Sequence, residues 1–201
     1  MNKHTRIGVL CALPLVAAIS LVGCSSHESS TAANGTMNHE SPTSSNTAAA
    51  SADIAFAQMM IPHHEQAVEM SELAPDRASS AFIKELAGRI QNAQQPEIDL
   101  MASWLTNWGV PRMNMADSLN AHAGHGMAGV MSEADMAKLT AAKGSQFDRL
   151  YAEMMIAHHE GAIEMAMAVE QSSNPEVSTL AKQIIAAQQV EIAEMQDFLQ
   201  P

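Results

Sequence analysis

Cysteine is nearly absent from this chain, which has two in 201 residues. Cys11 lies inside an apolar run near the N-terminus and Cys24 lies just after that run. If the run is removed as an export signal and Cys24 carries a lipid, no disulfide can form and no thiolate is left as nucleophile or metal ligand. Soft-ligand chemistry in this chain would therefore depend on its 16 methionines and 9 histidines.

The N-terminus has the organisation of a bacterial export signal. Two basic residues precede the apolar run Ile7–Val22, which is too short to span a membrane comfortably. The run leads into Leu21-Val22-Gly23-Cys24, which resembles a lipobox, whose cysteine becomes the first mature residue and carries the lipid. We expect residues 1–23 to be a lipoprotein signal peptide and Cys24 to anchor an extracytoplasmic protein to a bacterial membrane; a plain secretory signal is the alternative.

Basic residues are also scarce, since the chain has 10 Lys and Arg compared with 22 Asp and Glu. Its formal net charge is −12. Loss of Lys3 and Arg6 with the signal peptide leaves 8 against 22, or −14. This charge disfavours a nucleic-acid partner and gives weak support to cation binding. Nucleophile-elbow, phosphate-loop and dinucleotide-binding motifs are absent as well, so the sequence does not support catalysis.

Large apolar residues are few between Ser25 and Ser51, where Ser, Thr, Ala and Asn predominate. Such a segment cannot bury enough apolar surface to offset the entropy lost on ordering. We therefore expect residues 24–51 to comprise the lipidated Cys24 and a disordered stalk.

An internal repeat organises the rest of the chain. The segment Asp53–Met70 recurs as Asp148–Met165, with most positions identical or similar. Ten later positions also correspond between the copies, namely Leu86, Ala87, Ile90, Gln94, Gln95, Glu97, Ile98, Met101, Trp104 and Leu105 with Leu180, Ala181, Ile184, Gln188, Gln189, Glu191, Ile192, Met195, Phe198 and Leu199. We expect a first helical hairpin over 52–110, a connection with a short helix over 111–145 and a second hairpin over 146–200.

Both segments of each copy have helical periodicity. In the first, Phe56, Met60 and His63 fall on one helical face, while Glu65 and Glu69 lie away from it. One hairpin cannot bury the apolar stripes of both its helices, whereas two hairpins can bury them against each other. The sequence therefore predicts an all-α protein, an antiparallel four-helix bundle built from two duplicated helical hairpins.

Several residues mark the expected helix ends, with N-caps at Ser51, Ser132 and Asn174, a capping box from Ser145 to Asp148, and a stop at Gly109. Pro62 and Pro96 fall inside predicted helices, at positions where the other copy has Ala157 and Val190. We expect kinks there and not helix ends, because the corresponding helix lacks the proline and continues.

The pattern Met-Met-x-x-His-His occurs in both copies. It comprises Met59, Met60, His63 and His64, followed by Met70, and Met154, Met155, His158 and His159, followed by Met165. Residues three or four positions apart project from adjacent helical turns, so thioether and imidazole groups can converge on one ion. Thioethers favour Cu(I) and imidazole accepts either copper state, whereas the lack of thiolates and clustered carboxylates disfavours structural Zn, Mg or Ca. The pattern predicts a copper site, with Cu(I) favoured and Cu(II) as the second candidate.

Parts of this pattern also fit a role in packing or a different metal. Methionine often fills gaps in helical cores, and an inward histidine is commonly a hydrogen-bonded core residue, so a purely structural Met/His core stays open. Duplication would copy a structural histidine as faithfully as a ligand. A di-iron carboxylate site is disfavoured, because it needs Glu-x-x-His on two helices and no Glu in either copy precedes a His by three.

Four polar residues interrupt the apolar stripes of the second segment in each copy, namely Gln94, Glu97, Gln188 and Glu191. A buried carboxylate is costly unless it is paired, so we expect each Glu to accept a hydrogen bond from an inward histidine, His63 or His158. Such a bond would fix the tautomer and orientation of a metal-binding ring.

The connection between the copies is long for a helical bundle and contains further candidate ligands. These are Met113, Met115, His122, His125 and Met127. Their Met-x-Met and His-x-x-His spacing suits a flexible chelate for a soft ion or Cu(II). A Gly-rich linker that merely happens to contain these residues is the equal alternative.

Four segments together resemble the bacterial domain-of-unknown-function 305 family in its tandem form. They are Phe56–Met70, Phe147–Ala166, Ala93-Gln-Gln-Pro-Glu-Ile98 and Trp104-x-x-x-Trp108-Gly109, and the resemblance covers nearly all of Ser51–Leu199. It implies a ferritin-like helical bundle outside the cytoplasm and, as in some members of the family, copper binding and tolerance through Met and His. Carried over by motif, the resemblance points to the residues of the two Met-Met-x-x-His-His patterns.

Two functional hypotheses follow. In the first, the chain is a lipid-anchored extracytoplasmic protein that sequesters or transfers copper in metal homeostasis or tolerance, with a transfer partner that the sequence does not identify. In the second, it is a non-metal cell-envelope interaction module whose Met and His residues are purely structural. Replacement of His63 and His158 by Gln separates the two, because only the first predicts a change in copper tolerance.

Overall fold

The structure, a computed structural model, describes residues 49–117 and 127–201, all helices and connections with no strand among them. The predicted signal peptide, Cys24, most of the predicted stalk, His122 and His125 lie outside the described residues. The long helices of this part of the chain are α1 (Ser51–Glu72), α3 (Ala81–Trp108), α6 (Ser145–Met167) and α7 (Pro175–Phe198), and the short ones are α2 (Ala74–Arg77) and α5 (Glu133–Ala141). None of the described helices is long and apolar enough to cross a membrane.

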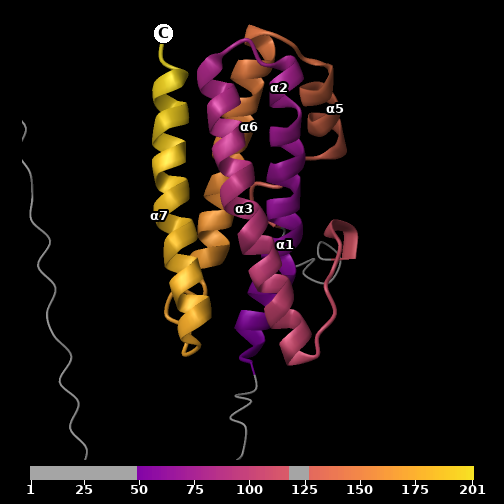
Figure 1. The fold of residues 1–201 in the computed structure, drawn as a ribbon, viewed down its shortest axis with the longest axis vertical. Coiled ribbons are helices and arrows are strands. Elements are labelled where there is room, and N and C mark those ends of the chain that lie inside the picture. Colours follow the sequence, from indigo (N-terminus) through magenta and orange to yellow (C-terminus); the bar gives the residue numbers. More distant parts are fainter. Residues whose placement is uncertain (1–48, 118–126) are drawn as a thin grey trace, which may run out of the picture. The chain divides into compact units, whose positions relative to one another are not determined.

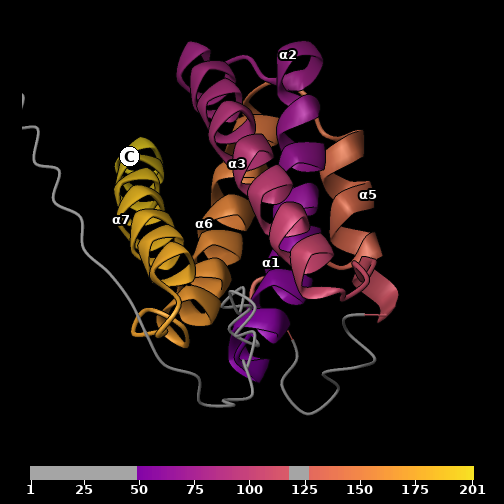
Figure 2. The same cartoon turned by 60° about the horizontal axis from the view of Figure 1, so that its bottom comes forward.

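The helices form two hairpins, one from each copy of the repeat. Helix α1 packs along α3, and α6 packs along α7 (Figures 1 and 2). The hairpins meet through α1 and α6, while α5 packs against α6. The outer helices α3 and α7 are joined by longer side chains, since the Phe82 and Phe198 rings stack with centroids 5.2 Å apart and Arg89 pairs with Glu194. The predicted all-α class is confirmed.

Three of the predicted helix ends are confirmed. The Ser132 hydroxyl accepts from the Asp135 amide at 3.1 Å, and the Asn174 side chain accepts from the Glu176 amide at 3.0 Å. Gly109 ends α3 with φ 70°, a left-handed conformation that glycine adopts without steric cost. Helices α1 and α3 continue through their internal prolines, as expected from the repeat.

Two predicted N-caps are wrong. Ser51 is already the first helical residue of α1, and Ala50 precedes it without a side-chain cap. Gly144, with φ 62°, precedes α6, so Ser145 and Asp148 form no capping box. At the start of α6 the local capping pattern fails because the Asp148 carboxylate is engaged by a distant loop.

The Asp148 carboxylate secures the start of α3 in the other hairpin. It accepts from the amides of Ser79 and Ser80, each at 3.0 Å, and from the Ser79 hydroxyl. The equivalent Asp53 of the first copy accepts from the Ser172 hydroxyl at 2.8 Å, in the connection between α6 and α7. Both carboxylates are almost fully buried. The same position in each copy therefore ties down the turn of the other copy.

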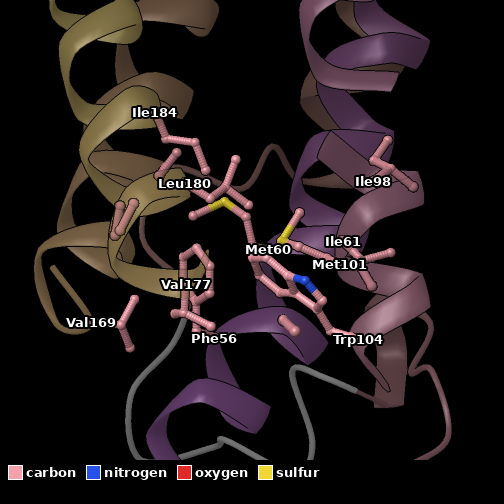
Figure 3. Packing of buried hydrophobic residues seen from close by; sticks show 14 of the residues in the cluster. Phe56, Met60, Ile61, Ile98, Met101, Trp104, Val169, Val177, Leu180 and Ile184 are labelled. Carbon is pink, nitrogen blue, oxygen red and sulfur yellow. The ribbon is translucent and has the colours of Figure 1, made fainter. Parts of the chain in front are cut away.

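The apolar core has two parts, one toward each end of the hairpins. The first core cluster includes Phe56, Met60, Ile98, Met101, Trp104, Leu180 and Ile184, and Figure 3 shows Met60 among side chains from α3 and α7. The second core cluster includes Met70, Leu86, Ile90, Phe147, Tyr151, Met155 and Met195. Each fully buried side chain of this size contributes about 1.5–3 kcal/mol to folding, so the two clusters hold the hairpins together.

Polar residues lie between the two core clusters on all four long helices. On α1, His63 and His64 fall between Met60 of the first cluster and Met70 of the second. On α3, α7 and α6 the corresponding residues are Gln94 with Glu97, Gln188 with Glu191, and His158 with His159. The helices thus bring the polar positions of both copies into one layer.

Candidate metal centre

The centre of this polar layer consists of four histidines, which we call the histidine layer: His63, His64, His158 and His159. All four are 0% exposed. Because α1 and α6 are in contact, the two copies meet here, and the ring centroids of His63 and His158 are 3.7 Å apart at an interplanar angle of 38°. The repeat therefore places two pairs of imidazoles in one buried region.

Each copy contains one histidine–glutamate pair. His64 Nε2 lies 2.8 Å from Glu97 Oε2, and His159 Nε2 lies 2.7 Å from Glu191 Oε2. Since a carboxylate only accepts, Nε2 donates the hydrogen bond, and in the neutral ring Nδ1 keeps its lone pair. The two glutamate side chains are 21% and 13% exposed, so they reach the edge of the layer.

The predicted glutamate partners were the wrong histidines. Glu97 and Glu191 were expected to bind His63 and His158, but they bind the following residue in each copy. Successive helical positions differ by about 100° in direction, so one histidine of each pair faces the glutamate of its own hairpin while the other faces the opposite copy. The helical repeat alone does not decide which histidine of each pair faces the glutamate and which faces the opposite copy.

Five ring nitrogens of the histidine layer lack hydrogen-bond partners. They are Nδ1 of His63, His64 and His159 and both nitrogens of His158. The side-chain oxygens of Gln94 and Gln188 in the same layer are also buried and unpartnered. Leaving one such atom unsatisfied costs about 1–3 kcal/mol, and native proteins seldom accumulate them. In a neutral imidazole one nitrogen carries a proton and the other a lone pair, so one His158 nitrogen and Nδ1 of His63, His64 and His159 offer four lone pairs. Such lone pairs are the donors that copper takes, so these four nitrogens fit a metal ion.

Burial keeps the two central rings neutral. Burial, together with the neighbouring His64, lowers the pKa of His63 from 6.5 to about 3. Burial and the nearby His63 lower the pKa of His158 well below its ordinary value. Only the neutral imidazole binds a metal, so neither ring needs to lose a proton for coordination near neutral pH.

The methionines of the two patterns do not gather at one point. Met60 is buried in the first core cluster, whereas Met155 and Met70 are buried in the second. Met165 packs against the first cluster and Met154 against the second, and Met59 is half-buried. Within the described residues, no group of three or more His, Cys, Asp or Glu is arranged to hold a metal. The His63 and His158 rings touch each other, so shared coordination of one ion requires at least one of them to rotate.

The sequence did not reveal that the end of the connection lies against the histidine layer. We call residues 127–131 the strap. The Ala128 carbonyl lies 3.3 Å from His63 Nε2, which donates to it. Gln66 holds Met131 on both sides, since its amide nitrogen donates to the Met131 carbonyl at 3.0 Å and its oxygen accepts from the Met131 amide at 2.8 Å.

Two glycines let the strap approach α6 closely. A Cβ on Gly161 would overlap the Ala128 carbonyl, and one on Gly129, whose φ is 79°, would overlap the Ala157 carbonyl. Gly161 occupies the position that Gln66 has in the other copy. The difference between Gln66 and Gly161 was the sequence signal for the position of the strap, because Gln66 holds the strap and Gly161 makes room for it.

The other candidate ligands of the connection do not join the histidine layer within the described residues. Met115 and Met127 line an open groove beside α1, with a volume of about 790 Å³, and Met113 is half-buried but is not among its lining residues. His122 and His125 cannot be placed, because they lie outside the described residues.

Comparison with known proteins agrees with this architecture. Residues 53–199 match the family model described as domain of unknown function (DUF305). A DUF305 protein from Streptomyces coelicolor that is described as secreted is 33% identical, with a TM-score of 0.68 over 74% of this chain and 91% of that chain. A DUF305 fragment from Deinococcus radiodurans is 31% identical, with a TM-score of 0.66 over 75% and 97% of the two chains.

Metal-bound relatives are also known. CopM in its Cu(I)-bound form is 31% identical, with a TM-score of 0.60 over 73% of this chain and 94% of that chain. CopM in its Cu(II)-bound form is 35% identical, with a TM-score of 0.61 and the same coverage. No curated protein matches the chain. The match over residues 53–199 and the identity above 30% to solved DUF305 proteins show that this chain belongs to the DUF305 family.

Proposed function

We propose that this protein is an extracytoplasmic copper-binding protein that sequesters or transfers copper. In this proposal residues 1–23 are removed as a signal peptide, Cys24 carries a lipid, and residues 24–50, which end where α1 begins at Ser51, are the stalk between membrane and bundle. The secreted description of the Streptomyces coelicolor relative and the copper-bound forms of CopM support the location and the cargo. The observation that carries the proposal is the set of five buried, unpartnered imidazole nitrogens contributed by both copies.

The histidine layer supplies the chemistry that copper requires. His63 and His158 are neutral because burial lowers the pKa of each ring. Glu97 and Glu191 hold His64 and His159 in one tautomer and place negative charge beside the layer, which favours a bound cation. Rotation of His63 or His158 out of their mutual contact would then present imidazole nitrogens to one ion.

The methionines would complement the imidazoles from within each copy. Met60 lies one helical turn from His63 on α1, and Met155 has the same relation to His158 on α6. Both sulfur atoms are buried at the boundary between a core cluster and the polar layer. A thioether with imidazoles is a ligand set that suits Cu(I), and the imidazoles alone also accept Cu(II).

The proposal is tested by anaerobic titration of the full-length protein with Cu(I) against a chromophoric Cu(I) chelator. We expect the wild-type protein to compete with the chelator and the variant with His63→Gln and His158→Gln to bind at least tenfold more weakly. Met167→Leu is the matched control, since Met167 is 61% exposed and lies outside the polar layer. Circular dichroism establishes that each variant is folded. Failure of the wild-type protein to compete, or unchanged affinity in a folded double variant, rules the proposal out.

One observation favours the second candidate function, a cell-envelope interaction module with a structural Met/His core. Met60 and Met155 lie in opposite core clusters, and the His63 and His158 rings pack against each other like core residues. Under this alternative the double variant changes the stability of the protein but leaves both its copper affinity and the copper tolerance of the host unaltered.

A further inference from the structure

A second cluster of methionines lies on the outer side of the strap. Met127 and Met131 of the strap, Met136 of α5 and Met115 line the groove of about 790 Å³ beside α1, and we call it the methionine groove. Met127 is 7% exposed and the other three are half-buried. The groove is open, and the side chains of Met115, Met131 and Met136 are partly exposed, whereas Met60 and Met155 are fully buried.

We infer that the methionine groove is a separate thioether site for a soft monovalent cation, Cu(I) in the cell. The inference rests on the proposed function in one respect, the choice of copper as the cargo. Thioether sulfur is a neutral, soft donor that binds Cu(I) and ions like it in preference to hard cations such as Mg²⁺ or Ca²⁺. Four such donors around one opening provide several coordination positions without any histidine.

The charge of the groove also suits a cation. Glu65, Glu69 and Glu133 line it together with the methionines. Glu65 is paired with Arg112, so Glu69 and Glu133 supply the remaining negative charge. A neutral thioether set does not compensate the charge of an ion, and nearby carboxylates lower the cost of placing it there.

The position of the groove connects it to the histidine layer. The strap that contributes Met127 and Met131 to the groove also contributes the Ala128 carbonyl that accepts from His63. Gln66 lines the groove and holds Met131 by two hydrogen bonds. The groove and the histidine layer therefore share the strap, and the groove is a site next to the buried one.

Packing is the competing role for this cluster. Met131 and Met136 also pack against the second core cluster, where methionine could serve as a flexible apolar side chain. Leucine has nearly the same volume and hydrophobicity but no sulfur, so Met→Leu substitutions separate packing from ligation.

The test is a titration of the full-length protein, labelled with ¹³C at the methionine methyl groups, with Ag(I) as a redox-stable soft ion. Single Met→Leu variants assign the resonances. We expect the methyl signals of Met115, Met131 and Met136 to shift within the first equivalents, while Met167, exposed but outside the groove, stays unchanged. The triple variant Met115→Leu, Met131→Leu and Met136→Leu should lose these shifts and bind Ag(I) at least tenfold more weakly at this site, while Met167→Leu binds as wild type.

The same titration distinguishes the groove from the histidine layer. In the variant with His63→Gln and His158→Gln, the methyl shifts of the groove should persist. Silent groove methyls alongside shifted histidine ring signals would refute the groove and leave the proposed function standing. Equal shifts at Met167 and in the groove would show nonspecific thioether binding and also refute it, and no response at any residue would refute both proposals.

Discussion

The two copies of the hairpin agree around their outer histidines, His64 and His159, and differ around their inner ones, His63 and His158. His64 with Glu97 and His159 with Glu191 form the same pair at 2.8 and 2.7 Å. In contrast, His63 donates to the Ala128 carbonyl, whereas neither nitrogen of His158 has a partner. The His–Glu pairs depend on contacts within a hairpin, which duplication preserves, while the inner rings depend on contacts between hairpins.

The strap accounts for this difference. A duplicated chain has two hairpins but only one connection between them, so the connection can lie against one histidine in one way only. Gln66 holds it on α1, and its counterpart Gly161 leaves space for it on α6. The positions at which the copies differ thus identify where the symmetry of the repeat is broken.

The largest expected effect concerns the two aspartates that join the copies. Asp148 accepts three hydrogen bonds and Asp53 accepts one from the opposite hairpin. Because hydrogen bonds to a buried carboxylate are strong, we expect Asp148→Ala to lower the free energy of unfolding by about 4 kcal/mol and Asp53→Ala by about 2 kcal/mol. Urea denaturation of the full-length protein, followed by circular dichroism, measures both. Equal losses would mean that the two carboxylates are equivalent despite their unequal contacts.

A smaller effect is expected where the strap crosses α6. A methyl group at Gly161 would overlap the Ala128 carbonyl, so we expect Gly161→Ala to destabilise the fold by about 1–3 kcal/mol, as overpacking does. Gly88 lies within α3 with no atom near an added Cβ, so Gly88→Ala is the matched control and should stabilise the protein by about 0.5–1 kcal/mol. A Gly161→Ala protein as stable as the wild type would show that the strap does not depend on this close approach.

The effect that is smallest per pH unit concerns the pH dependence of the two inner histidines, His63 and His158. Because the folded state holds the pKa of His63 at about 3, the unfolded chain binds a proton near pH 6.5 that the folded chain does not. The free energy of unfolding should therefore decrease as pH falls below 6.5, by about 1 kcal/mol per pH unit for this ring, and be fully retained above 6.5. The pKa of His158 is lowered for the same reason and adds to this slope.

Single variants separate the two rings. His63→Gln and His158→Gln should each flatten the dependence of the urea midpoint on pH between 6.5 and 4.5, measured without metal. A slope that neither substitution changes would mean that the rings are protonated in the folded protein.

Residues whose roles depend on their own helix were predicted well. Periodicity and the repeat predicted the helical class, and Ser132, Asn174 and Gly109 mark helix ends as expected. Predictions failed where a distant partner competes with a local one. Asp148 was expected to cap its own helix but binds Ser79 and Ser80, and Glu97 was expected to bind His63 but binds His64.

What the sequence determined by itself is the pair of helical hairpins with histidines at matching positions, because side-chain direction along a helix repeats every few residues and can be read locally. The tertiary structure decided which rings touch, which carboxylate each ring meets, and that Met60 and Met155 belong to opposite ends of the core. Those outcomes depend on the rotation of α1 between α3 and α6 and on where the single connection packs. Both are set by contacts between residues far apart in the chain, for which a repeat carries no local signal.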